Sequence, residues 1–161
     1  MNRRPIKTDL PLRASGEILG YRWAYHGEIR AGAVHDCVSM TGPDGGSSGG
    51  SSGALPFADL GWHKLGAIGS TGWSEQGSSP WWSFRKRYSL GYLNGVVARS
   101  VASVCVELER QSPAYAMLID SGHAEFQFFF FPLLPRTRWT NIVALNADGS
   151  VCDRFARPSH L

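Results

Sequence analysis

The stretch Ala-Glu-Phe-Gln-Phe-Phe-Phe-Phe-Pro-Leu at residues 124–133 carries the clearest structural signal in the chain. Side chains alternate between the two faces of a β-strand. Phe126, Phe128 and Phe130 therefore share one face, and Phe129 and Phe131 share the other. A strand with aromatic residues on both faces is typical of a sheet that is covered on both sides, or of a sheet with one face that meets a partner.

Turn signals on either side of this stretch predict a C-terminal meander of three strands, closed by a short segment at its end. Asp120-Ser-Gly, Pro135-Arg-Thr-Arg and Asp148-Gly are the predicted turns, because these residue types favour turn conformations. The segments between and beyond them are the predicted strands, at 114–119, 124–133, 139–146 and 151–155.

Before the meander, residues 86–110 match the spacing of a long helix. Leucine and valine recur there at steps of three and four residues, which draws an apolar stripe along one side of a helix. Pro113 ends the predicted helix near residue 111. Because β-branched valines lower helix propensity, a strand at 103–108 is the competing interpretation. The stripe consists of Leu90, Leu93, Val97, Val101, Val104 and Leu108.

Residues 45–53 read Gly-Gly-Ser-Ser-Gly-Gly-Ser-Ser-Gly, two copies of one unit without an apolar face. Such a composition is typical of a flexible coil, and we interpret it as an engineered linker rather than a natural low-complexity loop. It divides the chain into an N-terminal piece, 1–44, and a second piece, 54–161. The two pieces are either two fused chains, one chain with a replaced loop, or a circular permutant. Residues 54–80 are rich in glycine and are predicted to be mostly loop.

The N-terminal piece predicts an extended arm followed by a β-hairpin. Residues 17–25 alternate so that Tyr21, Trp23 and Tyr25 share one face. His26-Gly-Glu is the predicted turn, and residues 29–40 form the second strand, with valines inside and Asp36 outside. Two strands alone are marginally stable in water, so this hairpin is expected to complete the sheet of the second piece.

These elements predict an α+β fold, with an antiparallel sheet of about five strands packed against one long helix. The chain of 161 residues is long enough for one domain with a real core. The pieces 1–44 and 54–161 are therefore expected to form one folded unit.

Net charge and hydropathy indicate which classes of partner the sequence supports. The formal charge is +3, so nucleic acid is a possible partner that the net charge does not support. No stretch is long and apolar enough to span a bilayer.

Cys37, Cys105 and Cys152 have no metal-binding spacing. We expect three reduced thiols, with one disulfide and an odd thiol as the alternative.

Aromatic and basic residues supply the candidate binding residues. Trp81 and Trp82 precede three adjacent cations, and stacking rings beside charges suit single-stranded nucleic acid or a phosphate-bearing ligand. The simpler interpretation is a segment whose rings pack on the core while its cations face water. Two arginines in the turn after the aromatic strand extend the basic surface. The full set is Trp81, Trp82, Arg85, Lys86, Arg87, Phe129, Phe131, Arg136 and Arg138.

No residue pattern predicts a catalytic site, a metal site or a cofactor. Asp120-Ser-Gly-His123 and His35-Asp-Cys37 bring together groups used in nucleophilic catalysis. The first set lies where a turn belongs, and no oxyanion hole or orienting group accompanies either set. The histidines lack the spacing of metal ligands, so we expect structural roles for them.

Three function classes follow from these observations. The leading hypothesis is a protein-interaction or assembly module, joined by design into one chain, whose partner is another protein or a second copy of itself. The second is a small basic enzyme or toxin that acts on nucleic acid through Arg85, Lys86, Arg87, Asp120 and His123. The third is a carrier of a small apolar ligand, with the aromatic strand lining a pocket against the predicted helix.

Overall fold

In the computed structural model, three antiparallel sheets make up most of the described chain, which comprises residues 9–43, 45, 47–57, 61–62, 68–74 and 90–158. The N-terminal sheet contains, in spatial order, β1 (Leu12–Ile18), β2 (Tyr21–Arg30), β3 (Ala33–Thr41) and β4 (Ser47–Pro56). The central sheet contains β10 (Met117–Ile119), β11 (Phe126–Leu133), β7 (Gly91–Ala98), β6 (Ile68–Ser74) and β5 (Gly61–Trp62). The C-terminal sheet contains β13 (Val151–Ala156), β12 (Trp139–Leu145), β8 (Ser103–Leu108) and β9 (Ala114–Tyr115).

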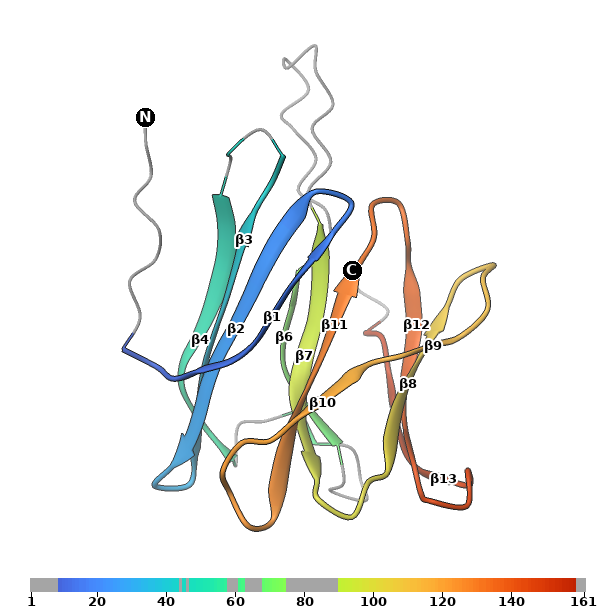
Figure 1. The fold of residues 1–161 in the computed structure, drawn as a ribbon. Helices are drawn as coiled ribbons and strands as arrows, with labels where there is room; N and C mark the ends of the chain where they lie inside the picture. The colour runs from blue at the N-terminus through green and yellow to red at the C-terminus, as the bar shows by residue number, and fades with distance from the viewer. Residues whose placement is uncertain are drawn as a thin grey trace.

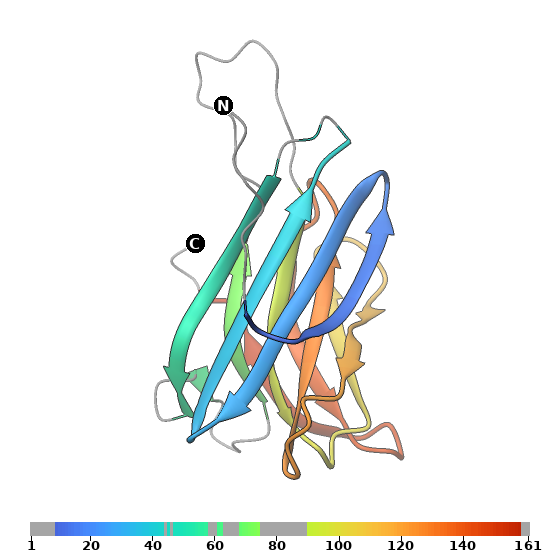
Figure 2. The same cartoon turned by 60° about the vertical axis from the view of Figure 1, so that its left-hand side comes forward.

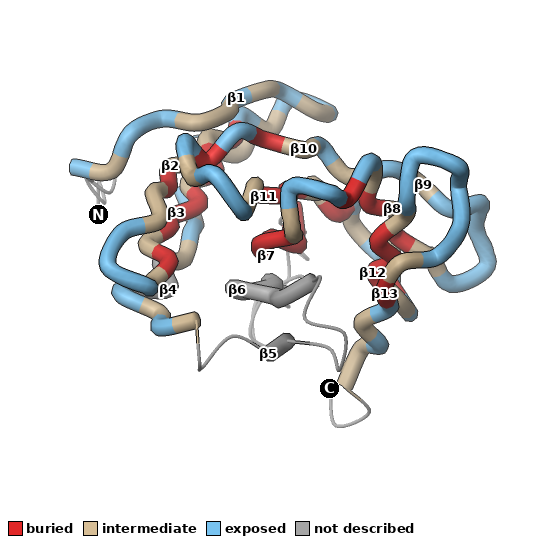
Figure 3. Tube along the Cα trace, turned by 90° about the horizontal axis from the view of Figure 1, so that it is seen from below, coloured by how far each residue is buried: buried red, intermediate tan, exposed pale blue. Residues whose placement is uncertain are grey.

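The central sheet lies between the other two and is covered on both faces. Figure 1 shows the N-terminal sheet on one side and the C-terminal sheet on the other, and Figure 3 shows the same three layers from below. Trp23 of β2 packs on Phe130 with a ring distance of 4.7 Å, and Tyr25 meets Phe128 edge-on at 5.4 Å. Phe129 packs instead with the core residues of the C-terminal sheet. The alternation predicted for the aromatic strand is therefore confirmed, and the covered-sheet alternative is the one observed.

The predicted long helix is wrong, because the described part of residues 86–111 forms two strands, β7 and β8. Nearly every residue of β7 is buried, since both faces of the central sheet are covered. An apolar run without alternation gives no strand period. Most of the supposed helical stripe packs into the core between the central and C-terminal sheets. The competing interpretation of a strand at 103–108 coincides with β8.

The predicted single sheet is also wrong, because the strands distribute over three sheets. In the C-terminal part, β10 pairs with β11 and β12 pairs with β13, close to the predicted strands. β11 and β12 do not pair, however, since β12 pairs with β8 in the C-terminal sheet. The N-terminal strands form a sheet of their own, which Figure 2 shows face-on, and they meet the aromatic strand through side chains.

The predicted turn at residues 26–28 lies inside β2, and the chain turns at Leu19-Gly20 and Ala31-Gly32 instead. All four of these turn residues have positive φ, between 51° and 77°. Positive φ at both central residues is the geometry of a tight two-residue hairpin. Leu-Gly and Ala-Gly are not the usual Asn-Gly signal, which explains why the sequence pattern misplaced the turn.

The glycine-serine segment, predicted as a flexible coil, lies largely in β4 and pairs with β3. Two of its glycines lie where a side chain would collide. A Cβ atom on Gly50 would come within 2.5 Å of the Tyr92 hydroxyl, and one on Gly49 would meet the Val38 carbonyl oxygen. Glycine therefore has a packing role here. The engineered origin of the segment stays a prediction, as does the division of the chain at this point. Residues 68–74, expected to be loop, form β6.

Candidate binding groove

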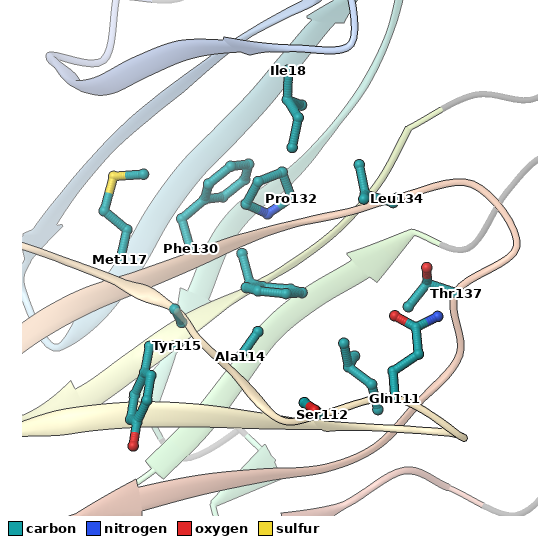
Figure 4. Close-up of a pocket in the computed structure, with 13 residues that line it drawn as sticks. Ile18, Gln111, Ser112, Ala114, Tyr115, Met117, Phe130, Pro132, Leu134 and Thr137 are labelled. Atoms are coloured by element: carbon teal, nitrogen blue, oxygen red, sulfur yellow. The ribbon is translucent and has the colours of Figure 1, made fainter.

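A groove of about 600 Å³ opens where the N-terminal and C-terminal sheets meet the edge of the central sheet. Figure 4 shows its lining side chains, which come from β1, the β8–β10 region, the end of the aromatic strand and the β11–β12 connection. Most of them are apolar. The lining residues are Ile18, Leu108, Gln111, Ser112, Ala114, Tyr115, Ala116, Met117, Phe130, Phe131, Pro132, Leu134 and Thr137.

The groove exists because the chain changes sheets between β9 and β10. Tyr115 pairs with Cys105 in the C-terminal sheet, whereas Met117 pairs with Phe130 in the central sheet. The backbone N–H of Ala116, between them, donates to the Val104 carbonyl at 2.8 Å. β10 therefore pairs only with residues 128–130 of β11, and Phe131 and Pro132, beyond the paired residues, line the groove.

The lining is apolar along its whole length, and its polar side chains gather at one end, where Leu134 also lies (Figure 4). Gln111 and Thr137 lie at one end of the groove, and Met117 and Tyr115 at the opposite end (Figure 4). The polar end is formed by the β8–β9 and β11–β12 connections, which the Glu109 N–H joins by donating to the Arg138 carbonyl at 2.8 Å. An amphipathic lining of this kind distinguishes the two ends of a bound molecule.

Of the predicted binding residues, one lines this groove and two flank a lining residue in sequence. Phe131 is half-buried and lines the groove, while Arg136 and Arg138 are exposed on either side of Thr137. Phe129 is fully buried between the central and C-terminal sheets, so its ring is inaccessible to a partner. The remaining predicted residues, Trp81, Trp82, Arg85, Lys86 and Arg87, lie outside the described residues.

The Asp120–His123 segment is a hydrogen-bonded turn in the structure. Arg99 donates to the Asp120 carboxylate at 2.7 Å and to the His123 carbonyl. The Arg99 hydrogen bond, with one from the Gly122 N–H, holds the pKa of the Asp120 carboxyl below its usual value. The Ser121 hydroxyl donates to the Phe126 carbonyl at 2.6 Å. These contacts give the Asp120 and Ser121 side chains structural partners, as the turn interpretation expects.

Asp36 was expected outside, but it is buried on the inner face of β3 beside Val34 and Val38. Residues 34, 36 and 38 share a face by strand alternation. The Asp36 carboxylate accepts hydrogen bonds from the Tyr25 hydroxyl at 3.1 Å and from the Asn94 amide at 2.8 Å. Burial, reinforced by the nearby carboxylate, raises the pKa of Tyr25 well above its usual value, which keeps its hydroxyl a donor. This network joins β2 and β3 to β7.

The pair His35 and Cys37 lies on the opposite face of β3. Among the residues the structure describes, no group of three His, Cys, Asp or Glu side chains is placed to hold a metal ion. Burial and the neighbouring Asp36 raise the pKa of the Cys37 thiol. All three cysteines are free of disulfides.

Cys37 is expected to react with a disulfide reagent at least about a hundredfold more slowly than Cys105 in the folded protein. Cys37 is only 2% exposed, whereas Cys105 is half-buried. Single-cysteine variants that retain one of the two thiols allow the rates to be compared directly. Equal rates in the folded state would contradict the placement of Cys37, and in urea the two thiols should react alike.

Few features of the sequence indicate the groove. Its walls come from segments that are distant in sequence and meet only through the crossing between sheets. Residue type selects Phe131 and the arginines on either side of Thr137 as candidates, but it does not select Tyr115 or Met117. Both are large apolar side chains, 67% and 41% exposed respectively, and exposure of that kind is visible only in the folded chain.

The described residues contain no helix long and apolar enough to cross a membrane. Comparison of the chain with models of protein families, with curated proteins and with solved structures finds no match.

Proposed function

We propose that this chain is a binding protein that holds a small apolar ligand in the groove bordered by the aromatic strand. The observation that carries the proposal is the groove itself, with a volume of about 600 Å³ and a mainly apolar lining. Ligand sites in proteins typically have volumes of roughly 300–1,000 Å³ and combine apolar walls with a few polar groups. This is the third function class that the sequence suggested.

Binding of a partner by strand addition has less support at this edge. An added strand takes its affinity from main-chain hydrogen bonds, and Pro132, which lines the groove, has no N–H to donate. Proline at a sheet edge is one of the ways in which proteins discourage strand pairing. The groove therefore suits an inserted apolar body better than an added strand.

A partner protein is the second candidate occupant, as in the leading sequence hypothesis. The exposed side chains of Tyr115, Met117 and Leu134 at the groove favour it, because large apolar residues grouped on a surface often mark an interface. Of the nucleic-acid hypothesis, only Asp120 and His123 lie among the described residues, and both belong to the turn tied by Arg99.

The neutral dye Nile red is expected to bind the folded protein at one site, with enhanced fluorescence. Ala114→Trp should weaken this binding at least about tenfold, because the indole would fill the groove that Ala114 lines. Ala156→Trp is the matched control, since Ala156 is exposed on β13 and does not line the groove. Fluorescence titration measures both dissociation constants, and circular dichroism establishes that each variant is folded.

If Ala114→Trp fails to fold, two variants that shorten exposed side chains provide the test instead. Met117→Ser removes apolar surface from the groove, and Leu12→Ser removes it from an exposed position outside the groove. We expect weaker dye binding only for Met117→Ser. Absence of dye binding to the unsubstituted protein would contradict the small-ligand proposal and leave the partner-protein candidate in its place.

A further inference from the structure

We propose that the ligand of the groove is a monomeric amphiphile with an anionic head group, whose head lies at the Gln111–Thr137 end. This inference rests on the function proposed above and adds the chemical class of the ligand. Three observations carry it: the polarity of the lining, the charge around its polar end, and the position of the apolar end.

The polar end offers hydrogen-bonding groups at the mouth of an otherwise apolar cavity. Gln111, Ser112 and Thr137 line that end, and the first two are exposed to solvent. Hydroxyl and amide groups can donate hydrogen bonds to an anionic oxygen. The rest of the lining gives an alkyl or aryl chain a surface to cover, and the free energy gained scales with the apolar area removed from water.

The two connections that form this end carry an excess of positive charge. Arg110 precedes Gln111, and Arg136 and Arg138 flank Thr137, all three exposed. Glu109 is the one acidic residue within the two connections, so their net charge is positive. The Glu109–Arg138 backbone hydrogen bond keeps the two connections side by side. All three are next in sequence to a polar lining residue, and positive charge near a concave site raises the local concentration of anions and favours an anionic head group.

The apolar end places the chain of such a ligand. Met117 lies at the end opposite Gln111 (Figure 4), with the Phe130 ring from the core and Ile18 from β1 beside the groove. Phe130 is fully buried and packs against Trp23, so it supports this end of the groove from the core side. The groove therefore fits a molecule with one charged end and one apolar end.

Three probes with the same ten-carbon chain separate the head-group claim from the function itself. Decanoate, decan-1-ol and decylammonium are compared by displacement of Nile red at low ionic strength. We expect decanoate to bind about fivefold more tightly than decan-1-ol, the size expected of two exposed ion pairs, and decylammonium to bind most weakly. Across carboxylates of increasing length, each added methylene should tighten binding about fourfold until the groove is filled.

Substitution of the arginines assigns the preference to this end of the groove. Arg110→Gln with Arg138→Gln should bring decanoate within about twofold of decan-1-ol, and so should 0.5 M salt, which screens exposed charges. Arg30→Gln removes one positive charge at the far end of β2 and is expected to leave the preference intact.

The outcomes distinguish the two proposals. Equal displacement by decanoate and decan-1-ol would overturn the anionic head group and leave the apolar-ligand function standing. No binding of Nile red or of any probe, measured also by direct titration calorimetry, would overturn both. Sedimentation with phosphatidylglycerol vesicles, together with no binding of monomeric decanoate, would point to a membrane surface and likewise contradict the inference.

Discussion

Replacing Phe128 with alanine is expected to lower the free energy of unfolding by about 3–5 kcal/mol, and replacing its neighbour Phe129 by a similar amount. Both side chains are fully buried, but they belong to different cores. Phe128 packs with Tyr25 of the N-terminal sheet, whereas Phe129 packs on the side of the C-terminal sheet. Replacing either of two adjacent strand residues can lower the free energy of unfolding this much only where both faces of the sheet are covered.

Urea denaturation followed by circular dichroism measures the two effects, with Tyr115→Ala as the control. Tyr115 is aromatic but 67% exposed, so its replacement should change stability by no more than about 0.5 kcal/mol. A loss below about 1 kcal/mol for either phenylalanine would mean that one face of the central sheet is open to solvent, contrary to the three-layer arrangement.

The replacement Asp36→Ala is expected to destabilise the protein by about 3 kcal/mol, because it leaves two buried donors without their acceptor. The Tyr25 hydroxyl and the Asn94 amide both donate to the Asp36 carboxylate, and all three residues are almost fully buried. The exposed carboxylate of Glu125 supplies the matched control, Glu125→Ala, with an expected change within about 0.5 kcal/mol.

A double-mutant cycle tests whether the network acts as a unit. Tyr25→Phe removes one of the two donors, so in that background the further replacement of Asp36 should cost less than in the unsubstituted protein. Additive losses would show that the Tyr25–Asp36 hydrogen bond contributes little, and that Asp36 acts through another contact.

The sequence predicted the strands around the aromatic stretch better than it predicted their partners. Alternation placed Phe128 and Phe129 on opposite faces, as observed. It failed for β7, because a strand buried on both faces has no alternation and its leucines and valines fell into a helical spacing. The cross-sheet connections, such as the one at Ala116 between β9 and β10, are set by tertiary packing and leave no local pattern.

Two predictions, for Asp36 and for the glycine-serine segment, are wrong because strand geometry and packing decide the structure there. The prediction of Asp36 outside is wrong, because its spacing from Val34 and Val38 puts it on the inner face of β3. The glycine-serine segment was assigned to coil by composition, whereas its glycines allow β4 to approach Tyr92 closely. The groove could not be predicted from the sequence either, because residues as far apart in the sequence as Ile18 and Thr137 line it together.

The most direct test of the proposed binding site is a map of backbone amide shifts as decan-1-ol is added to isotopically labelled protein. The account predicts that the largest changes gather at residues 111–117 and 130–137, on both walls of the groove. Saturable changes centred elsewhere, for example along β3 and β4, would contradict the assignment of the binding site to this groove.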